Sequence, residues 1–333
     1  MTRWLAYALT FLLAAGLAAW LTPRMREAAL RFGIVDQPDG KLKTQREPVP
    51  YLGGLAIYLA FLLALVMLPF DQEVLAMLLA GSIVVLLGLL DDLGQLRPWT
   101  KLAGQLVAVF VLVKSGLYIQ LTFLPAWMAI PVSVLWLLAA CNAFNLIDIM
   151  DGLSAGTAAV AALALLAVAD ANGNVASATL VASLAGACVG FLRYNFEPAR
   201  IYMGDAGALF LGLTLGAVAM DNAYTRENLL AAVAPALILG VPLFDMLFVM
   251  YVRHRRGLPV MLGSPDHVAL RLRKWRLTTR QTVLASYAAT ALLGSAAFAM
   301  TAVPLLGAEW ILGSLATVAL LCGAWLRRID MSL

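Results

Sequence analysis

Eleven long apolar runs follow one another along this 333-residue chain and leave little room for a soluble fold. A membrane-spanning helix needs about 20 predominantly apolar residues. The runs lie at about 4–21, 52–69, 74–90, 102–118, 125–142, 154–169, 175–192, 206–220, 229–251, 281–303 and 305–326. Because 13% of the residues are charged, against about 25% in soluble domains, we predict an all-α, polytopic integral membrane protein with about 11 transmembrane helices.

Other membrane architectures fit the pattern less well. Strands of outer-membrane barrels alternate apolar and polar residues over about ten positions, whereas these runs are continuous. No small-residue cleavage site follows residues 4–21, so they are expected to be the first helix and not a signal peptide. No repeat or linker divides the chain, and residues 1–333 are expected to form a single transmembrane domain. Gly212 and Gly216 form a G-x-x-x-G pair that predicts close helix packing.

Positive charge is distributed unevenly between the two sides that such a topology creates. With the N-terminus outside, the inner segments are 22–51, 91–101, 143–153, 193–205, 252–280 and the tail from residue 327, and they hold 20 of the 23 Lys and Arg residues. The positive-inside rule therefore predicts an outside N-terminus and a cytoplasmic C-terminus. The net charge of +4 follows from this orientation and from attraction to the inner leaflet, so no nucleic-acid partner is expected.

Acidic residues recur at the inner ends of several apolar runs. An Asp at the centre of a membrane helix costs roughly 3 kcal/mol on insertion scales, so polar groups near that depth usually mark chemistry or a pathway. Asp91 and Asp92 are adjacent, and neighbouring carboxylates repel unless a cation lies close by. Mg²⁺ prefers one or two carboxylates together with substrate phosphate oxygens. The pair is therefore a candidate phosphate-handling site, and a solvated helix end is the alternative.

Residues 142–156 read NAFNLIDIMDGLSAG, in which Asn142, Asn145, Asp148 and Asp151 recur at every third position. Residues three apart are neighbours on a helix, but such a row drifts by about 60° per step. The row therefore either spirals into a cavity or leaves the regular helix, and Asp151–Gly152 indicates a break there. A polar loop with an Asx turn is the alternative. Asp205 begins a later run and is either a functional acid or a helix N-cap.

Two inner loops and one apolar run contain further candidate residues. Lys43 lies in a turn-rich first loop and is a candidate contact for a diphosphate or an anionic headgroup. His267 in the last loop is a candidate for phosphate contact, and a structural histidine is the alternative. Asp245 lies within the run 229–251, roughly 9 Å from its cytoplasmic end. It is either functional or hydrogen-bonded to a neighbouring helix.

In their order along the chain, these motifs resemble those of the polyprenyl-phosphate N-acetylhexosamine-1-phosphate transferase family. The similarity extends from Asp36 to about Leu272 and is carried by Asp36, Pro38, Pro48, Pro50, Gly53, Gly54, Asp91, Asp92, Asn142, Ala143, Asn145, Asp148, Asp151, Gly152, Leu153, Gly204, Asp205, Gly207, His267, Arg271 and Leu272. The sequence departs from the family pattern at Ile149, Gln95, Ala269 and Leu270, and it lacks a first-loop histidine near Lys43. These departures concern sugar recognition more than the reaction class.

The resemblance implies a Mg²⁺-dependent glycosyl-1-phosphate transferase, with Mn²⁺ as the alternative ion. Such an enzyme would transfer an N-acetylhexosamine 1-phosphate, GlcNAc 1-phosphate first of all, from a UDP-sugar to undecaprenyl or another polyprenyl phosphate and release UMP. It would catalyse the first membrane step of a cell-envelope glycan pathway, in the bacterial inner membrane with its active site facing the cytoplasm. A homodimer is a further expectation from the family.

The resemblance also assigns roles to individual residues. The catalytic set would be Asp91, Asp92, Asp148 and Asp151; the substrate-binding set would be Asn142, Asn145, Lys43, His267 and Arg271; and the metal ligands would be Asp205 and Asp92. Single displacement and a covalent aspartyl intermediate both remain open, as does a different UDP-sugar such as one carrying phospho-N-acetylmuramoyl-pentapeptide. A secondary transporter would favour acids at the bilayer midplane and a two-fold repeat. A CDP-alcohol phosphotransferase would carry a D-G-x-x-A-R signature, which is absent here.

Overall fold

In the computed structural model, which describes residues 3–36, 48–66, 71–94, 96–121, 123–259 and 264–331, the chain is mostly helical. Its helices are α1 (Arg3–Arg31), α2 (Gly53–Ala64), α3 (Gln72–Gly94), α4 (Pro98–Lys114), α5 (Ala126–Leu146), α6 (Leu153–Ala171), α7 (Val175–Asn195), α8 (Gly204–Met220), η1 (Leu229–Val233), α9 (Ala234–Ile238), α10 (Gly240–Arg255), α11 (Val268–Lys274), α12 (Thr279–Met300) and α13 (Leu305–Leu326). A short antiparallel pair, β1 (Val35–Asp36) and β2 (Val49–Pro50), is an addition to the predicted all-α fold.

Each predicted apolar run overlaps a helix of the described residues, but the helices differ in length. Within the described residues, seven are long and apolar enough to cross a membrane, namely α1, α3, α5, α6, α7, α12 and α13. An eighth span exists if η1, α9 and α10 are counted together, and α2 and α8 are apolar but shorter. A multi-pass membrane protein is therefore confirmed, whereas eleven spans and the orientation of the termini stay predictions.

The run 229–251 was predicted as one continuous helix, and this is wrong. The segment Leu229–Ile238 meets α10 at an angle of 80°. Sharp bends of this kind are typical of Pro and Gly positions, and Gly240 and Pro242 both lie in the first turn of α10. Pro242 has no N–H, but the first N–H groups of a helix have no partner within the helix, so a new helix begins there at little cost.

Helix α8 lies at the centre of the bundle and packs against α3, α5, α2 and α6. Nearly all of its residues are buried. A Cβ atom added at Gly212 would lie 2.4 Å from the Ala140 carbonyl oxygen, and one at Gly216 would lie 2.9 Å from the Ala140 Cβ. The absence of side chains therefore lets α8 approach α5 closely, as the G-x-x-x-G spacing predicts.

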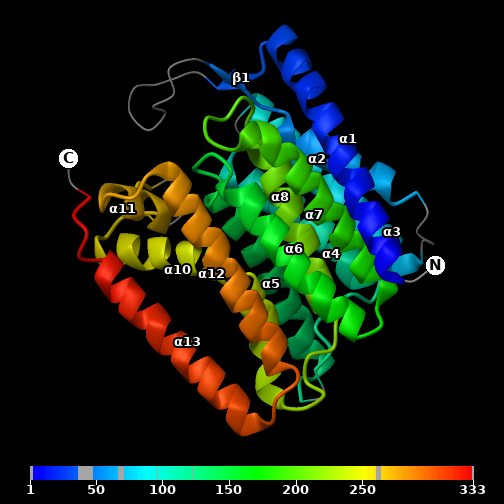
Figure 1. Cartoon of the computed structure of the whole chain (residues 1–333), viewed down its shortest axis with the longest axis vertical. Coiled ribbons are helices and arrows are strands. Elements are labelled where there is room, and N and C mark those ends of the chain that lie inside the picture. The colour runs from blue at the N-terminus through cyan, green and yellow to red at the C-terminus, as the bar shows by residue number, and fades with distance from the viewer. Residues whose placement is uncertain are drawn as a thin grey trace.

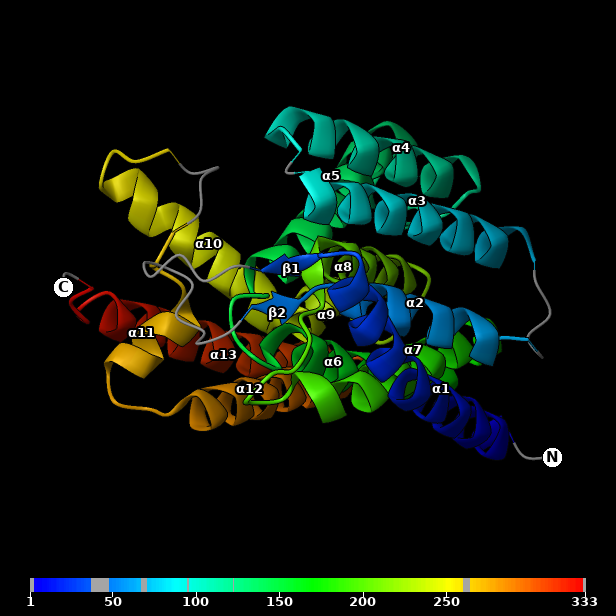
Figure 2. The ribbon, with the colours of Figure 1, turned by 90° about the horizontal axis from the view of Figure 1, so that it is seen from above.

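The C-terminal helices form the opposite side of the molecule from α1 (Figures 1 and 2). Helix α13 runs along the edge of this side, and 6% of its apolar window is buried inside the protein. Such a helix is apolar around its circumference and is suited to contact with lipid. Helix α12 packs against α6 and α9 and so joins the C-terminal group to the rest of the bundle.

Candidate active site

The ends of four helices meet around a group of charged side chains. Asp91 and Asp92 lie at the C-terminal end of α3, and Asn145 lies at the C-terminal end of α5. Asp205 is in the first turn of α8, and Lys101 is in the first turn of α4. Hydrogen bonds and ion pairs connect all five residues, which we call the acidic cluster.

Lys101 lies at the middle of the acidic cluster, although the sequence analysis did not select it. Its Nζ is 3.0 Å from Asp91 Oδ2 and 3.2 Å from Asn145 Oδ1. It also forms an ion pair with Asp205 Oδ2. In the sequence Lys101 is one of many basic residues in the predicted inner segments, so its charge alone does not distinguish it. Its position in the first turn of the helix that follows Asp91 and Asp92 is the feature that could have identified it as a partner of these acids.

Asp205 and Asp91 are each held by a further hydrogen bond. The Asn145 Nδ2 donates to Asp205 Oδ1 at 2.7 Å. The backbone N–H of Leu96 donates to Asp91 Oδ1 at 2.5 Å. Each of these carboxylates therefore uses one oxygen for a fixed contact and directs the other to Lys101, so two acids converge on a single cation.

Asp92 faces a different partner from its neighbour Asp91. Its oxygens accept hydrogen bonds from the backbone N–H groups of Asp205 at 2.9 Å and Ala206 at 3.3 Å. Gly204 permits this approach, because it has φ +73° and an added Cβ would lie 2.6 Å from Asp92 Oδ2. Asp92 thus acts as the cap of α8, which favours a positioning role over the predicted contact with metal.

The predicted Gly-Gly and Gly-Asp motifs form two sides of one contact. The N–H of Gly53 donates to the Tyr202 carbonyl at 3.0 Å, and the N–H of Gly54 donates to the Met203 carbonyl at 2.8 Å. A Cβ added at Gly54 would lie 2.1 Å from the Gly207 nitrogen. The start of α2 therefore fixes the segment that leads into Asp205.

The loop between α5 and α6 carries Asp148 and Asp151, and the helix break predicted at Gly152 is confirmed there. Burial raises the pKa of the Asp148 carboxyl well above its ordinary value, and the charges of Asp205, Asp92 and Asp151 raise that pKa further. Asp148 is therefore close enough to the acidic cluster for the charges of Asp205 and Asp92 to act on its carboxyl group. Asp151 Oδ2 instead accepts the Ala199 N–H at 2.8 Å, and burial also raises the pKa of the Asp151 carboxyl.

The Asn142 side chain forms a hydrogen bond with α4. Its Nδ2 donates to Gln105 Oε1 at 3.0 Å and to the Leu138 carbonyl at 2.8 Å. Gln105 is buried in α4, so the pair ties α4 to α5. This arrangement gives Asn142 a supporting contact and offers no evidence for the predicted contact with substrate.

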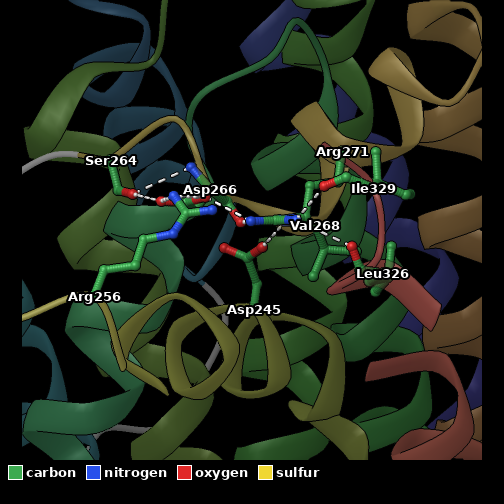
Figure 3. A network of polar contacts seen from close by, with 8 residues as sticks. All are labelled: Asp245, Arg256, Ser264, Asp266, Val268, Arg271, Leu326 and Ile329. Atoms are coloured by element: carbon green, nitrogen blue, oxygen red, sulfur yellow. Dashed lines mark hydrogen bonds and ion pairs between the residues drawn. The ribbon is translucent and has the colours of Figure 1, made fainter. Parts of the chain in front are cut away.

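A second network lies around Asp245, Asp266 and Arg271 (Figure 3), and His267 belongs to it. Asp245 of α10 is buried and accepts two hydrogen bonds of 2.6 Å, one from His267 Nδ1 and one from the Val268 N–H. The alternative in which Asp245 binds a neighbouring segment is thus confirmed. Within the described residues, the polar contact of the His267 ring is with Asp245 and not with the acidic cluster.

Arg271 is the centre of this second network (Figure 3). Its guanidinium pairs with Asp266 and donates to the carbonyls of Leu326 at 3.0 Å and Ile329 at 2.9 Å. The exposed fraction of Arg271 is 0%. In this arrangement Arg271 holds the end of α13, and its predicted contact with substrate stays a prediction.

The structure therefore brings together Asp91, Asp92, Asn145 and Asp205, with Asp148 nearby, and it places His267 and Arg271 in a separate network. Lys43 lies outside the described residues. Across the described residues, no group of three or more His, Cys, Asp or Glu is arranged to hold a metal ion. A Mg²⁺ site that relies on substrate phosphates needs one or two carboxylates, and the convergence of the Asp91 and Asp205 carboxylates on one ammonium group fits this requirement.

Comparison with known proteins agrees with the location of the acidic cluster. Residues 74–223 match the family model described as Glycosyl transferase family 4. This range includes every member of the acidic cluster and the loop of Asp148, but it ends before α10.

Several bacterial proteins are similar over most of the chain. A probable undecaprenyl-phosphate N-acetylglucosaminyl 1-phosphate transferase from Bacillus subtilis is 33% identical over 277 residues, which cover 80% of this chain and 77% of the relative. A decaprenyl-phosphate N-acetylglucosaminephosphotransferase from Mycolicibacterium smegmatis is 31% identical, with coverage of 84% and 78%. A phospho-N-acetylmuramoyl-pentapeptide-transferase from Heliobacterium modesticaldum is 33% identical, with coverage of 78% and 86%.

Proposed function

The chain belongs to glycosyl transferase family 4, and we propose that it transfers an N-acetylhexosamine 1-phosphate from a UDP-sugar to a polyprenyl phosphate, releasing UMP. The observation that carries this proposal is the convergence of Asp91, Asp205 and Asn145 on the ammonium group of Lys101. GlcNAc 1-phosphate is the first candidate for the transferred group, because the relatives from Bacillus and Mycolicibacterium are named for it.

The charges of the site support a role for a divalent cation. Four carboxylates lie in or beside the acidic cluster, against the single ammonium of Lys101. Both proposed substrates carry phosphate, and transfer between phosphates depends mainly on positioning and charge neutralisation. Asp205 and Asp91 would hold Mg²⁺, with Mn²⁺ as an alternative, because their carboxylates already converge on one cation. The ion would supply Lewis-acid neutralisation of phosphate oxygens.

Residues of the chain itself would bind and orient the substrates. Lys101 would bind phosphate oxygens through its ammonium group, and Asp91 would orient or deprotonate the lipid phosphate. Asn145 would align Asp205 through the 2.7 Å hydrogen bond, and Asp92 would fix the start of α8. Asp148, whose pKa burial raises, would face the donor nucleotide.

The proposed location follows from the charge distribution. The acidic cluster is formed by the predicted inner ends of α3, α4, α5 and α8, where Lys and Arg residues are concentrated. UDP-sugars are cytosolic, so the site would face the cytoplasm in a bacterial inner membrane. This is where the first membrane step of a cell-envelope glycan pathway would take place.

A UMP-release assay on the purified protein tests the function. We expect UMP from UDP-GlcNAc only when both polyprenyl phosphate and Mg²⁺ are present, and a parallel reaction with UDP-N-acetylmuramoyl-pentapeptide decides between the two donor classes. Asp205→Asn should lower turnover by about 10²- to 10³-fold, as the loss of a preorganised electrostatic group does. Asp221→Asn, at the other end of α8, is the matched control and should retain turnover.

Two results would reject the proposal. One is release of UMP at the same rate without the lipid phosphate, which would make the protein a hydrolase. The other is turnover by Asp205→Asn that equals that of Asp221→Asn, since the acidic cluster would then be irrelevant to the reaction.

A further inference from the structure

The loop that carries Asp148 and Asp151 is held at its last residue by two different helices. The N–H of Gly152 donates to Asn195 Oδ1 of α7 at 3.1 Å. The Gly152 carbonyl accepts a hydrogen bond of 2.5 Å from the Tyr287 hydroxyl of α12. Asn195 lies on α7 and Tyr287 on α12, so the loop is tied both to the bundle and to the C-terminal helices.

The conformation of Gly152 makes this support necessary. Its φ is +77°, a region that Gly enters freely and other residues rarely adopt. Gly also loses the most conformational freedom on folding, so the junction between the loop and α6 is intrinsically permissive. The Gly152 carbonyl accepts one hydrogen bond within α6, from the Gly156 N–H. The Tyr287 hydroxyl donates a second hydrogen bond to this carbonyl.

Helix α6 is shaped to admit the tyrosine. A Cβ atom added at Gly156 would lie 1.9 Å from the Tyr287 hydroxyl oxygen and 1.9 Å from its Cζ. The Tyr287 ring therefore crosses α6 at a position without a side chain, one turn after Gly152. This fit places the hydroxyl on the Gly152 carbonyl and leaves little freedom for another arrangement.

We propose that Tyr287 is a positioning residue that fixes the Asp148 loop toward the acidic cluster, an inference that rests on the proposed transferase function. Tyr287 acts through the loop and does not contact substrate. Misplacement of a functional group by about 1 Å can cost about 10²-fold in rate. Because the Gly156 hydrogen bond remains when the hydroxyl is removed, we expect a smaller loss, of about tenfold in kcat/KM.

Tyr287→Phe tests the hydroxyl alone, because the ring and its packing are kept. The matched control is Tyr194→Phe, which removes a hydrogen bond of the same type, from the Tyr194 hydroxyl to the Ala19 carbonyl at 3.1 Å. Tyr194 lies on α7, and its hydroxyl binds α1 and not the loop. We expect a loss of about tenfold in kcat/KM for Tyr287→Phe and unchanged kcat/KM for Tyr194→Phe.

Two further measurements separate positioning from general stability. In an Asp148→Asn background, assayed at high enzyme concentration, Tyr287→Phe should cause no additional loss, because residues that act through one another are not additive. Hydrogen exchange should accelerate in residues 148–153 of Tyr287→Phe and remain unchanged in the rest of the bundle. Gly156→Ala, which displaces the tyrosine, should reproduce both effects.

Equal losses in Tyr287→Phe and Tyr194→Phe, or multiplied losses in the double variant, would overturn the inference. If the wild-type protein released no UMP, the proposed function would fail by itself. Exchange at residues 148–153 would still decide the role of the tyrosine: faster exchange in Tyr287→Phe supports the contact, and unchanged exchange overturns it.

Discussion

Replacement of Asp92 provides the most direct test of how the site is built, because its two oxygens have defined partners. Asp92→Ala removes the hydrogen bonds to the N–H groups of Asp205 and Ala206. Loss of a single helix cap typically costs about 1 kcal/mol, and up to about 2 kcal/mol, while hydrogen bonds to charged groups contribute about 1.5–3 kcal/mol each. Two such bonds at the start of a buried helix give an expected loss of about 3 kcal/mol.

Asp92→Asn should lose roughly half of this amount, because the amide keeps one acceptor oxygen but not the charge. For a chain of this size, 1 kcal/mol corresponds to about 2 °C in Tm. We therefore expect thermal unfolding in detergent about 6 °C lower for Asp92→Ala and about 3 °C lower for Asp92→Asn. Turnover should fall by about 10²-fold in Asp92→Ala, because Asp205 shifts with the start of α8.

Asp71→Ala is the matched control for this experiment. Asp71 Oδ1 accepts the Val74 N–H at 2.8 Å, so it caps the opposite end of α3 from Asp92. Its loss should lower Tm by about 2 °C and leave turnover unchanged. A Tm for Asp92→Ala within 1 °C of wild type, by our estimate from the cap energies, would refute the capping role. Equal activity in the two variants would refute the link between that cap and Asp205.

Three more predictions follow from individual contacts. Lys101→Met should lower turnover by about 10²-fold, whereas Lys114→Met, at the other end of α4, should not. Asp148→Asn should unfold at a higher temperature than wild type at pH 8. Burial raises the pKa of Asp148 in the folded protein, so the stability that its protonated form provides is lost as pH rises through that pKa. The Asn side chain does not ionise and keeps that stability. The difference in Tm should disappear as pH falls toward the ordinary pKa of Asp, and a pH-independent difference would contradict the reasoning. Arg271→Lys should lower stability by about 3 kcal/mol, because a lysine cannot reproduce the fork that reaches four acceptor atoms. Exposed Arg273→Lys should be neutral in the same thermal unfolding experiment.

The sequence predicted the helical architecture and most members of the acidic cluster, because apolar length and the cost of acids near lipid are local properties. It did not predict that Asp91 and Asp92 would contact different partners. Adjacent residues on a helix differ by about 100° in direction, so one carboxylate faces Lys101 and the other faces the start of α8. Which neighbour each one meets depends on the packing of α4 and α8, and the order of residues does not contain that information.

The last inner loop shows a similar limit. His267 was predicted to contact phosphate from its residue type and position, and Arg271 from the family resemblance, but the same chemistry suits a buried hydrogen-bond network. The deciding partners are Asp245, 22 positions before His267, and the carbonyls of Leu326 and Ile329, more than 50 positions after Arg271. Such distant contacts are visible only when α10 and α13 are placed beside the loop.

The directions of the helices explain why charges of both signs collect at this point. The C-terminal end of a helix carries partial negative charge, so Asp91 and Asp92 at the end of α3 are unfavourable there by themselves. The N-terminal ends of α4 and α8 bring the opposite partial charge, together with the Lys101 ammonium and the N–H groups that Asp92 accepts. The carboxylates are therefore stabilised by neighbouring helices and not by their own. An acidic site assembled in this way keeps its geometry only while α3, α4 and α8 remain packed, and for this reason changes at Asp92 are expected to affect stability and turnover together.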